Sequence, residues 1–176
     1  MRVIGGEFRS RRLKSLPGLN TRPTPDRLRE TLFNILSPLI QGALFVDAYA
    51  GTGAVGIEAL SRGASRAIFI ERSRAAVEVI RDNLTSLGLG GRSEVFMGKT
   101  VSVLERVQAD IVFLDPPYEL EKEYKDALDL LGAREDAPGL VIAQHAAKAE
   151  LAKSYGNLHE SRVLKQGDNA LTFYSF

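Results

Sequence analysis

Residues 44–56 read LFVDAYAGTGAVG, an apolar strand followed by a glycine-rich turn and the start of a helix. The glycines allow a sharp turn and a close approach of the backbone to a ligand, and the helix directs its N-terminus at the same place. Gly51–Gly56 matches the dinucleotide-binding fingerprint, but four residues led by Asp47 separate its first glycine from the strand. A carboxylate there suits a cationic or amino-bearing ligand better than a pyrophosphate. The stretch therefore predicts a ligand site at this strand end, with a purely structural turn as the alternative.

Strands and helices alternate along the rest of the chain. Strands are predicted at residues 44–47, 66–71, 93–97, 111–114, 140–143, 158–164 and 170–176. Helices are predicted from residue 26 to a stop at Pro38 and Gly42, and over residues 55–62, 73–87, 101–107, 121–131 and 146–154. The alternation indicates an α/β fold with a parallel sheet, and the turn at Gln166–Asn169 joins the last two strands as an antiparallel hairpin. We therefore expect a seven-stranded, mostly parallel sheet with a C-terminal antiparallel hairpin.

The composition limits the class of protein. A length of 176 residues predicts one compact domain. The absence of cysteine excludes a disulfide scaffold, a cysteine zinc site, an iron–sulfur cluster and a thiolate nucleophile. The two histidines, His145 and His159, argue against a histidine-based metal site, so no metal is expected. No apolar run approaches the ~20 residues of a membrane span, and the start lacks the apolar region of a signal peptide. We therefore expect a cytoplasmic protein that does not contact a membrane.

The N-terminus is basic. Residues 1–30 hold eight basic and three acidic residues, a net charge of +5, whereas the remaining 146 residues hold 15 basic and 19 acidic residues, a net charge of −4. Residues 1–14 are predicted to form a small β-hairpin arm and residues 15–24 a loop, so an N-terminal segment of residues 1–24 precedes a main domain of residues 25–176. A basic segment on an acidic body suggests a polyanionic partner, with a solvated charged edge as the alternative.

Ligands of doubly wound sheets bind beyond the carboxyl ends of the strands, so the residues that follow each strand are the candidates. Glu71 follows the second strand, and its two oxygens can accept both hydroxyls of a ribose. The alternative for Glu71 is a cap for the helix that begins at Ser73. Gly98–Thr100 follows the third strand, where backbone groups would contact an adenine ring. The side chain of Lys99 cannot accept a hydrogen bond from an adenine amino group.

The fourth strand ends in Asp115-Pro116-Pro117-Tyr118. The prolines fix the backbone and remove two amide donors, which leaves the Asp115 carboxylate and the Pro116 carbonyl as acceptors. Such acceptors suit a planar NH2 group, and Tyr118 can stack on the base that carries this group. A rigid turn with a helix-capping acid is the structural alternative.

Taken together, these motifs resemble the class I S-adenosylmethionine (SAM)-dependent methyltransferases, a Rossmann-like fold. The residues 115–118 resemble the Asn/Asp-Pro-Pro-Tyr motif of the members that methylate exocyclic amines. The segments RVIGG (2–6), RPTPDRLRETLFNIL (22–36), Phe45–Ala64 and GDNALTFY (167–174) resemble the RsmD family over nearly the whole chain. The resemblance implies a bacterial enzyme that methylates N2 of one guanine in small-subunit (16S) ribosomal RNA. Two residues depart from the family: Lys99 stands where an acid is usual, and Gln144 lies near a position where relatives tend to carry glutamate.

The strand-end reading and the resemblance together give three sets of expected site residues. The catalytic residues are Asp115, Pro116, Pro117 and Tyr118. The SAM-binding residues are Arg22, Thr24, Asp47, Tyr49, Ala50, Gly51, Thr52, Gly53, Glu71, Arg72, Gly98, Lys99 and Thr100. The RNA-binding residues are Arg2, Arg9, Arg11, Arg12 and Lys14, which would bind phosphates and fix register rather than read bases.

Three other functions stay open at this point. An adenine-N6 methyltransferase acting on DNA or RNA would use the same acceptors, because adenine also offers an NH2 group. A non-catalytic rRNA-binding assembly factor would keep the fold, and a nicotinamide-dependent oxidoreductase would use Gly51–Gly56 but leave Asp47 and residues 115–118 unexplained. The resemblance favours a small ribosomal subunit or a late assembly intermediate as substrate, and we expect a monomer. Transfer of a methyl group to an amine leaves the nitrogen with one proton too many. The sequence leaves open whether Asp115 or water takes this proton.

Overall fold

The computed structural model describes residues 1–18 and 23–176. The helices of the described part are α1 (Asp26–Ile40), α2 (Ala54–Ser61), α3 (Arg74–Ser86), the short 3-10 helix η1 (Gly90–Arg92), α4 (Thr100–Leu104) and α5 (Glu121–Ala133). The strands are β1 (Leu44–Asp47), β2 (Arg66–Glu71), β3 (Ser93–Met97), β4 (Ile111–Leu114), β5 (Leu140–Ala146), β6 (Ser154–Tyr155), β7 (Leu158–Gln166) and β8 (Asn169–Ser175).

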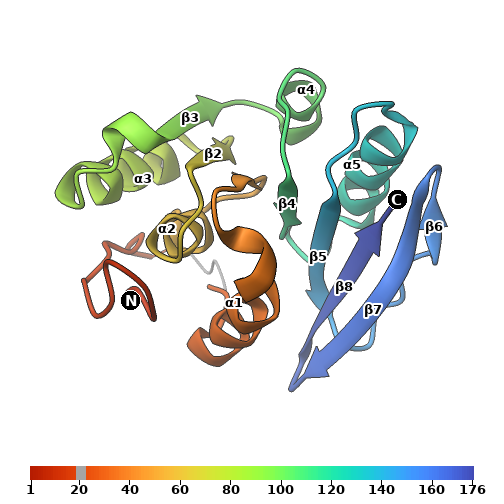
Figure 1. The fold of residues 1–176 in the computed structure, drawn as a ribbon, viewed down its shortest axis with the longest axis horizontal. Helices are drawn as coiled ribbons and strands as arrows, with labels where there is room; N and C mark the ends of the chain where they lie inside the picture. The colour runs from red at the N-terminus through yellow and green to blue at the C-terminus, as the bar shows by residue number, and fades with distance from the viewer. Residues whose placement is uncertain (19–22) are drawn as a thin grey trace.

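The strands form one sheet in the order β3-β2-β1-β4-β5-β8-β7-β6 (Figure 1). The pairs from β3 to β5 are parallel, and the pairs that join β5, β8, β7 and β6 are antiparallel. The α/β, Rossmann-like class with C-terminal antiparallel strands is therefore confirmed. The chain leaves β1 toward β2 and β3, then returns to β4 on the other side of β1. Between β1 and β4 lies the point where the strand order reverses, which is where open α/β sheets bind their ligands.

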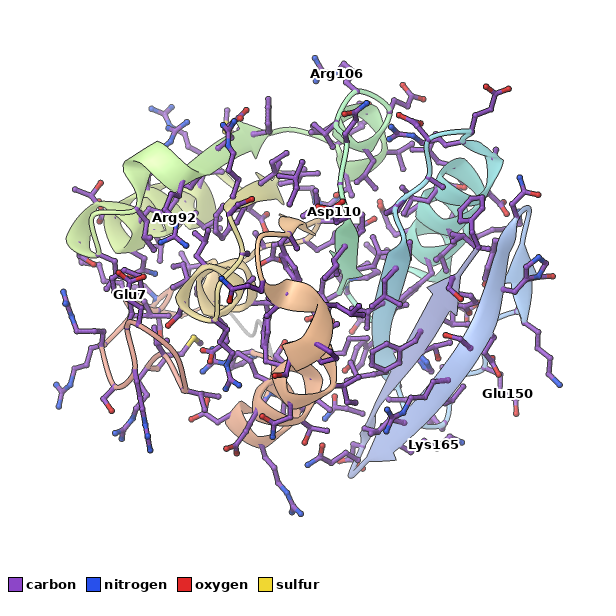
Figure 2. All side chains as sticks on the ribbon, viewed as in Figure 1. Glu7, Arg92, Arg106, Asp110, Glu150 and Lys165 are labelled. Atoms are coloured by element: carbon purple, nitrogen blue, oxygen red, sulfur yellow. The ribbon has the colours of Figure 1, made fainter. Side chains whose placement is uncertain are left out.

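Helices cover both faces of the sheet. Successive strand residues point to opposite faces, so each strand contributes to two apolar layers. Phe45, Phe69 and Phe113 pack in one layer with residues of α1, α2 and α3. Val46 and Val112 pack in the other layer with residues of α4 and α5. Side chains fill the space between helices and sheet (Figure 2). This packing holds the strand ends, and hence the residues that follow them, in fixed positions.

The prediction of seven strands and of a helix over residues 146–154 is wrong. Strand β5 runs on to Ala146, which pairs with Asn169 of β8, and Ser154–Tyr155 forms an eighth strand against β7. The alanine-rich stretch has the composition of a helix, but pairing across the sheet overrides this weak local preference. A second difference is smaller: α1 continues past Pro38, which lies in its last turn, and ends at the buried Ile40.

The N-terminal segment forms no regular hairpin within the described residues. A single antiparallel bridge joins Arg2 and Arg12, although the Val3 amide also donates to the Arg11 carbonyl at 2.9 Å. The side chains of Val3 and Leu13 are buried in the same layer as α1 and α2. The segment is therefore part of the body rather than a free arm. A domain boundary after residue 24 stays a prediction.

A buried acid on α2 holds this segment in place. The two carboxylate oxygens of Glu58 accept hydrogen bonds from the backbone amides of Ile4 and Gly5, each at 2.9 Å. Arg62 donates to the same carboxylate at 2.9 Å. Further out, Glu7 lies 3.5 Å from Arg92 (Figure 2). Several contacts therefore fix where the basic residues of the N-terminus can lie.

Candidate active site

The glycine-rich turn and the Asp-Pro-Pro-Tyr corner (residues 115–118) lie at the ends of neighbouring strands. Asp47 is the last residue of β1 and pairs with Phe113 of β4, two residues before Asp115. The Ala48 amide donates to the Phe113 carbonyl at 3.0 Å, so the strands stay together where the two motifs begin. Both motifs therefore occupy one edge of the sheet, on either side of the point where the strand order reverses.

Two glycines shape the turn. Gly51 and Gly53 have φ values of 57° and 84°, which side chains with a Cβ rarely adopt. Nothing lies within 4 Å of the position of a Cβ at Gly51, so one face of the turn is open. Gly56 has a different reason: a Cβ there would lie 2.3 Å from the ring of Phe69. The turn is thus open on one side and α2 packs tightly on β2 on the other.

Two carboxylates accept hydrogen bonds from backbone amides of the glycine-rich turn and of the helix that follows it. The buried Asp47 accepts a hydrogen bond from the Gly56 amide at 2.9 Å. Burial raises the pKa of Asp47 to about 7; the bond from Gly56 opposes the rise and the charge of Glu71 adds to it. Glu71 accepts hydrogen bonds from the amides of Gly51 and Ser73, each at 2.9 Å. Each carboxylate oxygen can accept two hydrogen bonds, so Glu71 retains acceptor capacity for a ligand.

Asp115 is the third carboxylate of this edge. Burial raises its pKa to about 8, and the charge of Asp47 adds to the rise. The Thr24 hydroxyl lies 3.5 Å from the Asp115 carboxylate and 3.1 Å from the side-chain oxygen of Gln144. Asp47 and Asp115 are thus two acids that repel one another when both are ionised. A positively charged ligand between them would relieve this repulsion.

The rest of the corner is held by hydrogen bonds from other elements. The Tyr124 hydroxyl lies 2.7 Å from the Gln144 carbonyl and 3.3 Å from the Pro116 carbonyl. A hydroxyl has one hydrogen to donate, so the Pro116 oxygen is at most weakly engaged. The Tyr118 hydroxyl donates to the side-chain oxygen of Asn169 at 2.5 Å. The corner therefore presents a carboxyl group, a carbonyl oxygen and an anchored aromatic ring.

Comparison with known proteins shows the family of the chain. The family model described as "Conserved hypothetical protein 95" matches residues 1–175. "Ribosomal RNA small subunit methyltransferase D" of Escherichia coli K12 is 43% identical over 120 residues, which cover 67% of this chain and 60% of that relative's length. The chain belongs to the RsmD family.

Two further likenesses extend over the full length of this RsmD-family chain. "Putative rRNA methyltransferase YlbH" of Bacillus subtilis is 34% identical over 181 residues, covering 99% of this chain and 98% of the relative. The solved structure of "Putative methyltransferase yhhF" of Escherichia coli superposes with a TM-score of 0.84 at 35% identity, covering 99% of this chain and 97% of that one. The resemblance inferred from the motifs is confirmed, and this RsmD-family chain is a SAM-dependent methyltransferase.

Several of the site residues expected for the RsmD family converge. Hydrogen bonds or electrostatic interactions connect Thr24 with Asp115, Asp115 with Asp47, Asp47 with Glu71, and Glu71 with Gly51. Ala50 and Gly53 belong to the same turn, where the Gly53 amide donates to the Ala50 carbonyl at 2.8 Å. Arg22 lies outside the described residues.

Other expected residues use their polar groups within the protein. The Tyr49 hydroxyl donates to Glu123 of α5 at 2.8 Å, and the Thr100 hydroxyl donates to the Ala48 carbonyl at 2.8 Å. Both side chains brace the loops at the strand ends. Arg72 and Lys99 are exposed. The Gly98 amide donates to the Glu71 carbonyl at 3.1 Å, which keeps the end of β3 beside the end of β2.

Three supporting residues were missed in the sequence. Tyr124 lies on the apolar face of α5 and gives no sign there that its hydroxyl reaches the Asp-Pro-Pro-Tyr corner. Asn169 belongs to the hairpin turn, where asparagine is ordinary. Asn83 did carry a signal, since it is a polar residue on the buried face of α3. Its side-chain amide donates to the carbonyls of Thr52 and Lys14, at 3.1 and 3.2 Å, and so fastens the N-terminal segment to the glycine-rich turn.

Proposed function

We propose that the chain transfers a methyl group from SAM to the exocyclic N2 of a guanine in 16S rRNA, giving N2-methylguanine. The observation that carries this proposal is the position of the Asp-Pro-Pro-Tyr corner beside Asp47 and the glycine-rich turn. The name of the Escherichia coli relative, a small-subunit rRNA methyltransferase, supports the substrate.

The residues of this edge fit SAM. The cofactor carries a positively charged sulfur and an amino group, and the edge offers acids rather than cations at Asp47 and Asp115. Glu71 can accept hydrogen bonds from the ribose hydroxyls of SAM. The open face of Gly51 leaves room for the methionine part of the cofactor. Residues 98–100 would face the adenine, and Thr24, whose hydroxyl lies 3.5 Å from the Asp115 carboxylate, would lie against the cofactor. When bound, SAM supplies a methyl group that its positive sulfur has already activated.

The corner acts on the amine. A guanine amino nitrogen is a poor nucleophile because its lone pair is delocalised into the ring. Hydrogen bonds from its two N–H groups to Asp115 and to the Pro116 carbonyl draw the nitrogen toward a tetrahedral geometry and return lone-pair density. The task of the protein is then to hold this nitrogen in line with the methyl group at ~3–3.5 Å. Asp115 or water takes the surplus proton after transfer.

Tyr118 holds the base. A base inside a helix cannot reach this edge, so it must leave its stack first. Stacking on an aromatic ring contributes ~1–3 kcal/mol per base. The hydrogen bond from the Tyr118 hydroxyl to Asn169 fixes the ring before the base arrives.

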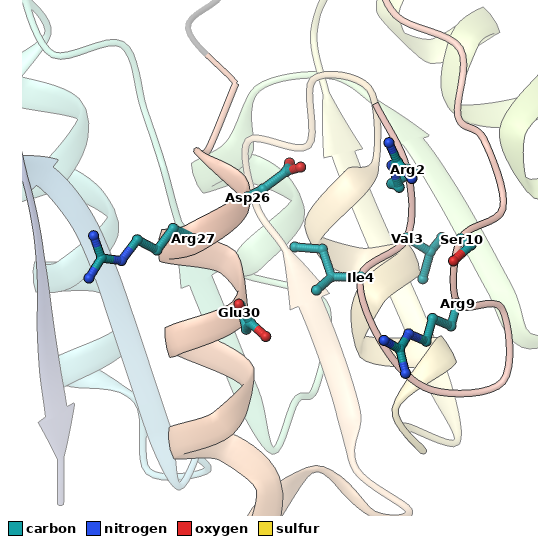
Figure 3. Close-up of a pocket in the computed structure, with 8 residues that line it drawn as sticks. All are labelled: Arg2, Val3, Ile4, Arg9, Ser10, Asp26, Arg27 and Glu30. Carbon is teal, nitrogen blue, oxygen red and sulfur yellow. The ribbon is translucent and has the colours of Figure 1, made fainter.

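The N-terminal arginines supply the phosphate contacts. Arg2 and Arg9 line a hollow of about 490 Å³ between the N-terminal segment and the start of α1 (Figure 3). Arg11 instead donates to the Ser86 carbonyl at 3.2 Å, and Lys14 pairs with Asp82 at 3.0 Å, both on α3. We assign the main RNA contact to Arg2 and Arg9, and a secondary contact to Arg11, Arg12 and Lys14.

We extend the proposal to the context of the reaction. A docked segment of 14 residues offers too little surface to select one guanine among many, so the substrate is a small ribosomal subunit or a late assembly intermediate. The protein acts there as a monomer, in the cytoplasm. No helix in residues 1–18 and 23–176 is long and apolar enough to cross a membrane.

The identity of the product tests the proposal. Small subunits from a strain that lacks this gene are incubated with the purified protein and SAM, and the rRNA is digested and analysed by mass spectrometry. The expected product is N2-methylguanosine at one position. N6-methyladenosine would establish the adenine alternative, and no methylated nucleoside would favour the non-catalytic one.

A further inference from the structure

A second hollow lies beside the catalytic corner. It has a volume of about 240 Å³ and lies between the start of α1 and the turn that joins β7 to β8. Its lining residues are Pro25, Arg27, Leu28, Gln166, Gly167 and Asn169. None of them was assigned above to the cofactor site or to a phosphate contact, and only Arg27 among them also lines the first hollow.

Residues on both walls of this hollow contact residues 115–118 or adjoin a residue that does. On one wall, Asn169 accepts the hydrogen bond of the Tyr118 hydroxyl. On the other wall, Pro25 follows Thr24, whose hydroxyl lies 3.5 Å from the Asp115 carboxylate. A base held by Tyr118 and Asp115 would therefore have this hollow at its side.

Gln166 leaves an acceptor without a partner. Its side-chain oxygen is buried and forms no hydrogen bond, a property that only the Nε of Arg29 shares among the side-chain atoms of residues 1–18 and 23–176. Buried polar atoms are nearly always paired, because an unpaired one has lost its water without a replacement. Gln166 lines the hollow and is only partly buried as a residue, so a rotation of its amide would offer this unpaired acceptor to a donor from the substrate.

Arg27 adds donors to the same hollow. Its side chain points away from Arg2 and Arg9, toward the C-terminal strands (Figure 3). An acceptor and a donor in the walls of one hollow match one edge of guanine, where the N1–H donor stands beside the O6 acceptor. Adenine presents the reverse order, an N1 acceptor beside an N6 donor.

We propose that this hollow receives the Watson–Crick edge of the target guanine, with the Gln166 oxygen accepting from N1–H and Arg27 donating to O6. The inference rests on the proposed function and adds to it the residues that select guanine over adenine. An amine is then methylated only when it belongs to a base that also presents an N1–H donor and an O6 acceptor.

A base analogue tests the inference. Small subunits are reconstituted with 2-aminopurine at the methylated position, which keeps the 2-amino group but lacks both N1–H and O6. The wild-type protein is expected to methylate the guanine substrate at least about 10-fold more efficiently, in kcat/KM, than the analogue. Gln166→Leu removes the acceptor at similar volume, and should lower kcat/KM on guanine by about 10- to 100-fold while leaving the analogue unchanged or improved. Gln166→Glu keeps an acceptor oxygen and should retain the preference for guanine.

The controls separate this inference from folding and from the proposed function. Gln108→Leu alters an exposed glutamine after α4 and should change nothing. The melting temperature and the Kd for SAM should stay the same in every variant. Equal losses on both substrates in Gln166→Leu, or an unchanged preference for guanine, would overturn the role of Gln166. A wild-type protein that methylates no guanine would overturn the proposed function, and this inference with it.

Discussion

In the proposed mechanism, Asp115 is the residue on which methyl transfer depends most. Asp115→Ala removes the carboxylate that we propose contacts the amine but leaves the glycine-rich turn and Glu71 in place. We expect the rate of methyl transfer to fall at least about 100-fold, while the Kd for SAM changes by less than about threefold. Single-turnover transfer and calorimetry measure the two quantities. Asp129→Ala, at an exposed position of α5, is the matched control. Transfer that stays within a few-fold of wild type would remove Asp115 from the mechanism.

The raised pKa values of Asp47 and Asp115 predict that SAM binding depends on pH. Both acids hold protons in the free protein until the pH passes about 7 and about 8 respectively. A bound cation favours their ionised forms, so binding releases protons. Below pH 7 the Kd for SAM should rise, by up to about tenfold per pH unit for each proton released. Calorimetry from pH 5.5 to 8.5 measures this slope. S-adenosylhomocysteine, which lacks the charge on sulfur, should show a shallower slope, and equal slopes would contradict the assignment.

The same two acids set the direction of a stability change in the free protein. Their folded pKa values exceed the ordinary value of 3.8, so between pH 4 and 8 the folded state binds protons that the unfolded chain has released. This contribution to the free energy of unfolding is therefore present at low pH and is lost as the pH rises toward 8. The melting temperature should fall less over this range in Asp115→Ala than in wild type. An identical fall would show that Asp115 does not titrate in this window.

At the scale of elements, the contact between α2 and β2 fixes the glycine-rich turn. Gly56→Ala places a methyl group 2.3 Å from the Phe69 ring, so α2 must move. We expect a loss of about 1–3 kcal/mol in the free energy of unfolding, together with weaker SAM binding. Gly90→Ala is the matched control, because nothing lies within 4 Å of its Cβ position. Chemical denaturation measures both variants, and equal stabilities would show that the close contact is not required.

The N-terminal segment calls for substitution rather than deletion. Residues 1–14 contribute the buried Val3 and Leu13 to the body, so their removal would disturb the core as well as the RNA contact. Replacing Arg2 and Arg9 together by alanine should weaken RNA binding and lower the slope of log K against log salt by about 1 to 2. Arg74→Ala on α3 is the control. A slope that does not change would exclude the two arginines as phosphate contacts.

The order of elements and the strand ends could be predicted from the sequence, and the supporting contacts could not. Asp47, Glu71 and residues 115–118 follow apolar strands, and the edge where they meet follows from the rule for parallel sheets. The end of β5 was mistaken for the start of a helix because Ala146 takes its conformation from Asn169 of β8, 23 positions along the chain. The partners of Tyr118 and Pro116 come from β8 and α5 for the same reason: they depend on tertiary packing, which local patterns do not record.

At the scale of the whole molecule, the proposed function uses the two halves of the sheet for different ligands. In this proposal, the half with β2 and β3 offers the groups for a nucleoside, and the half with β4, β5 and the C-terminal hairpin offers the groups for the base that is methylated. The basic N-terminal segment is fastened to the first half by Glu58 and Asn83. The start of α1 lies between this segment and the β7–β8 turn, next to both hollows. In the proposed function, RNA that contacts Arg2 and Arg9 is thus brought to the Asp-Pro-Pro-Tyr corner.

A crystal structure with S-adenosylhomocysteine tests most directly whether the glycine-rich turn and residues 115–118 form one site. The account predicts that the ribose hydroxyls bind Glu71, that the amino acid part lies over Gly51 and Gly53, and that the sulfur faces Asp115 and the Pro116 carbonyl with room for one amino group between them. A ligand whose sulfur points away from residues 115–118, or that binds away from the ends of β1 and β4, would contradict it.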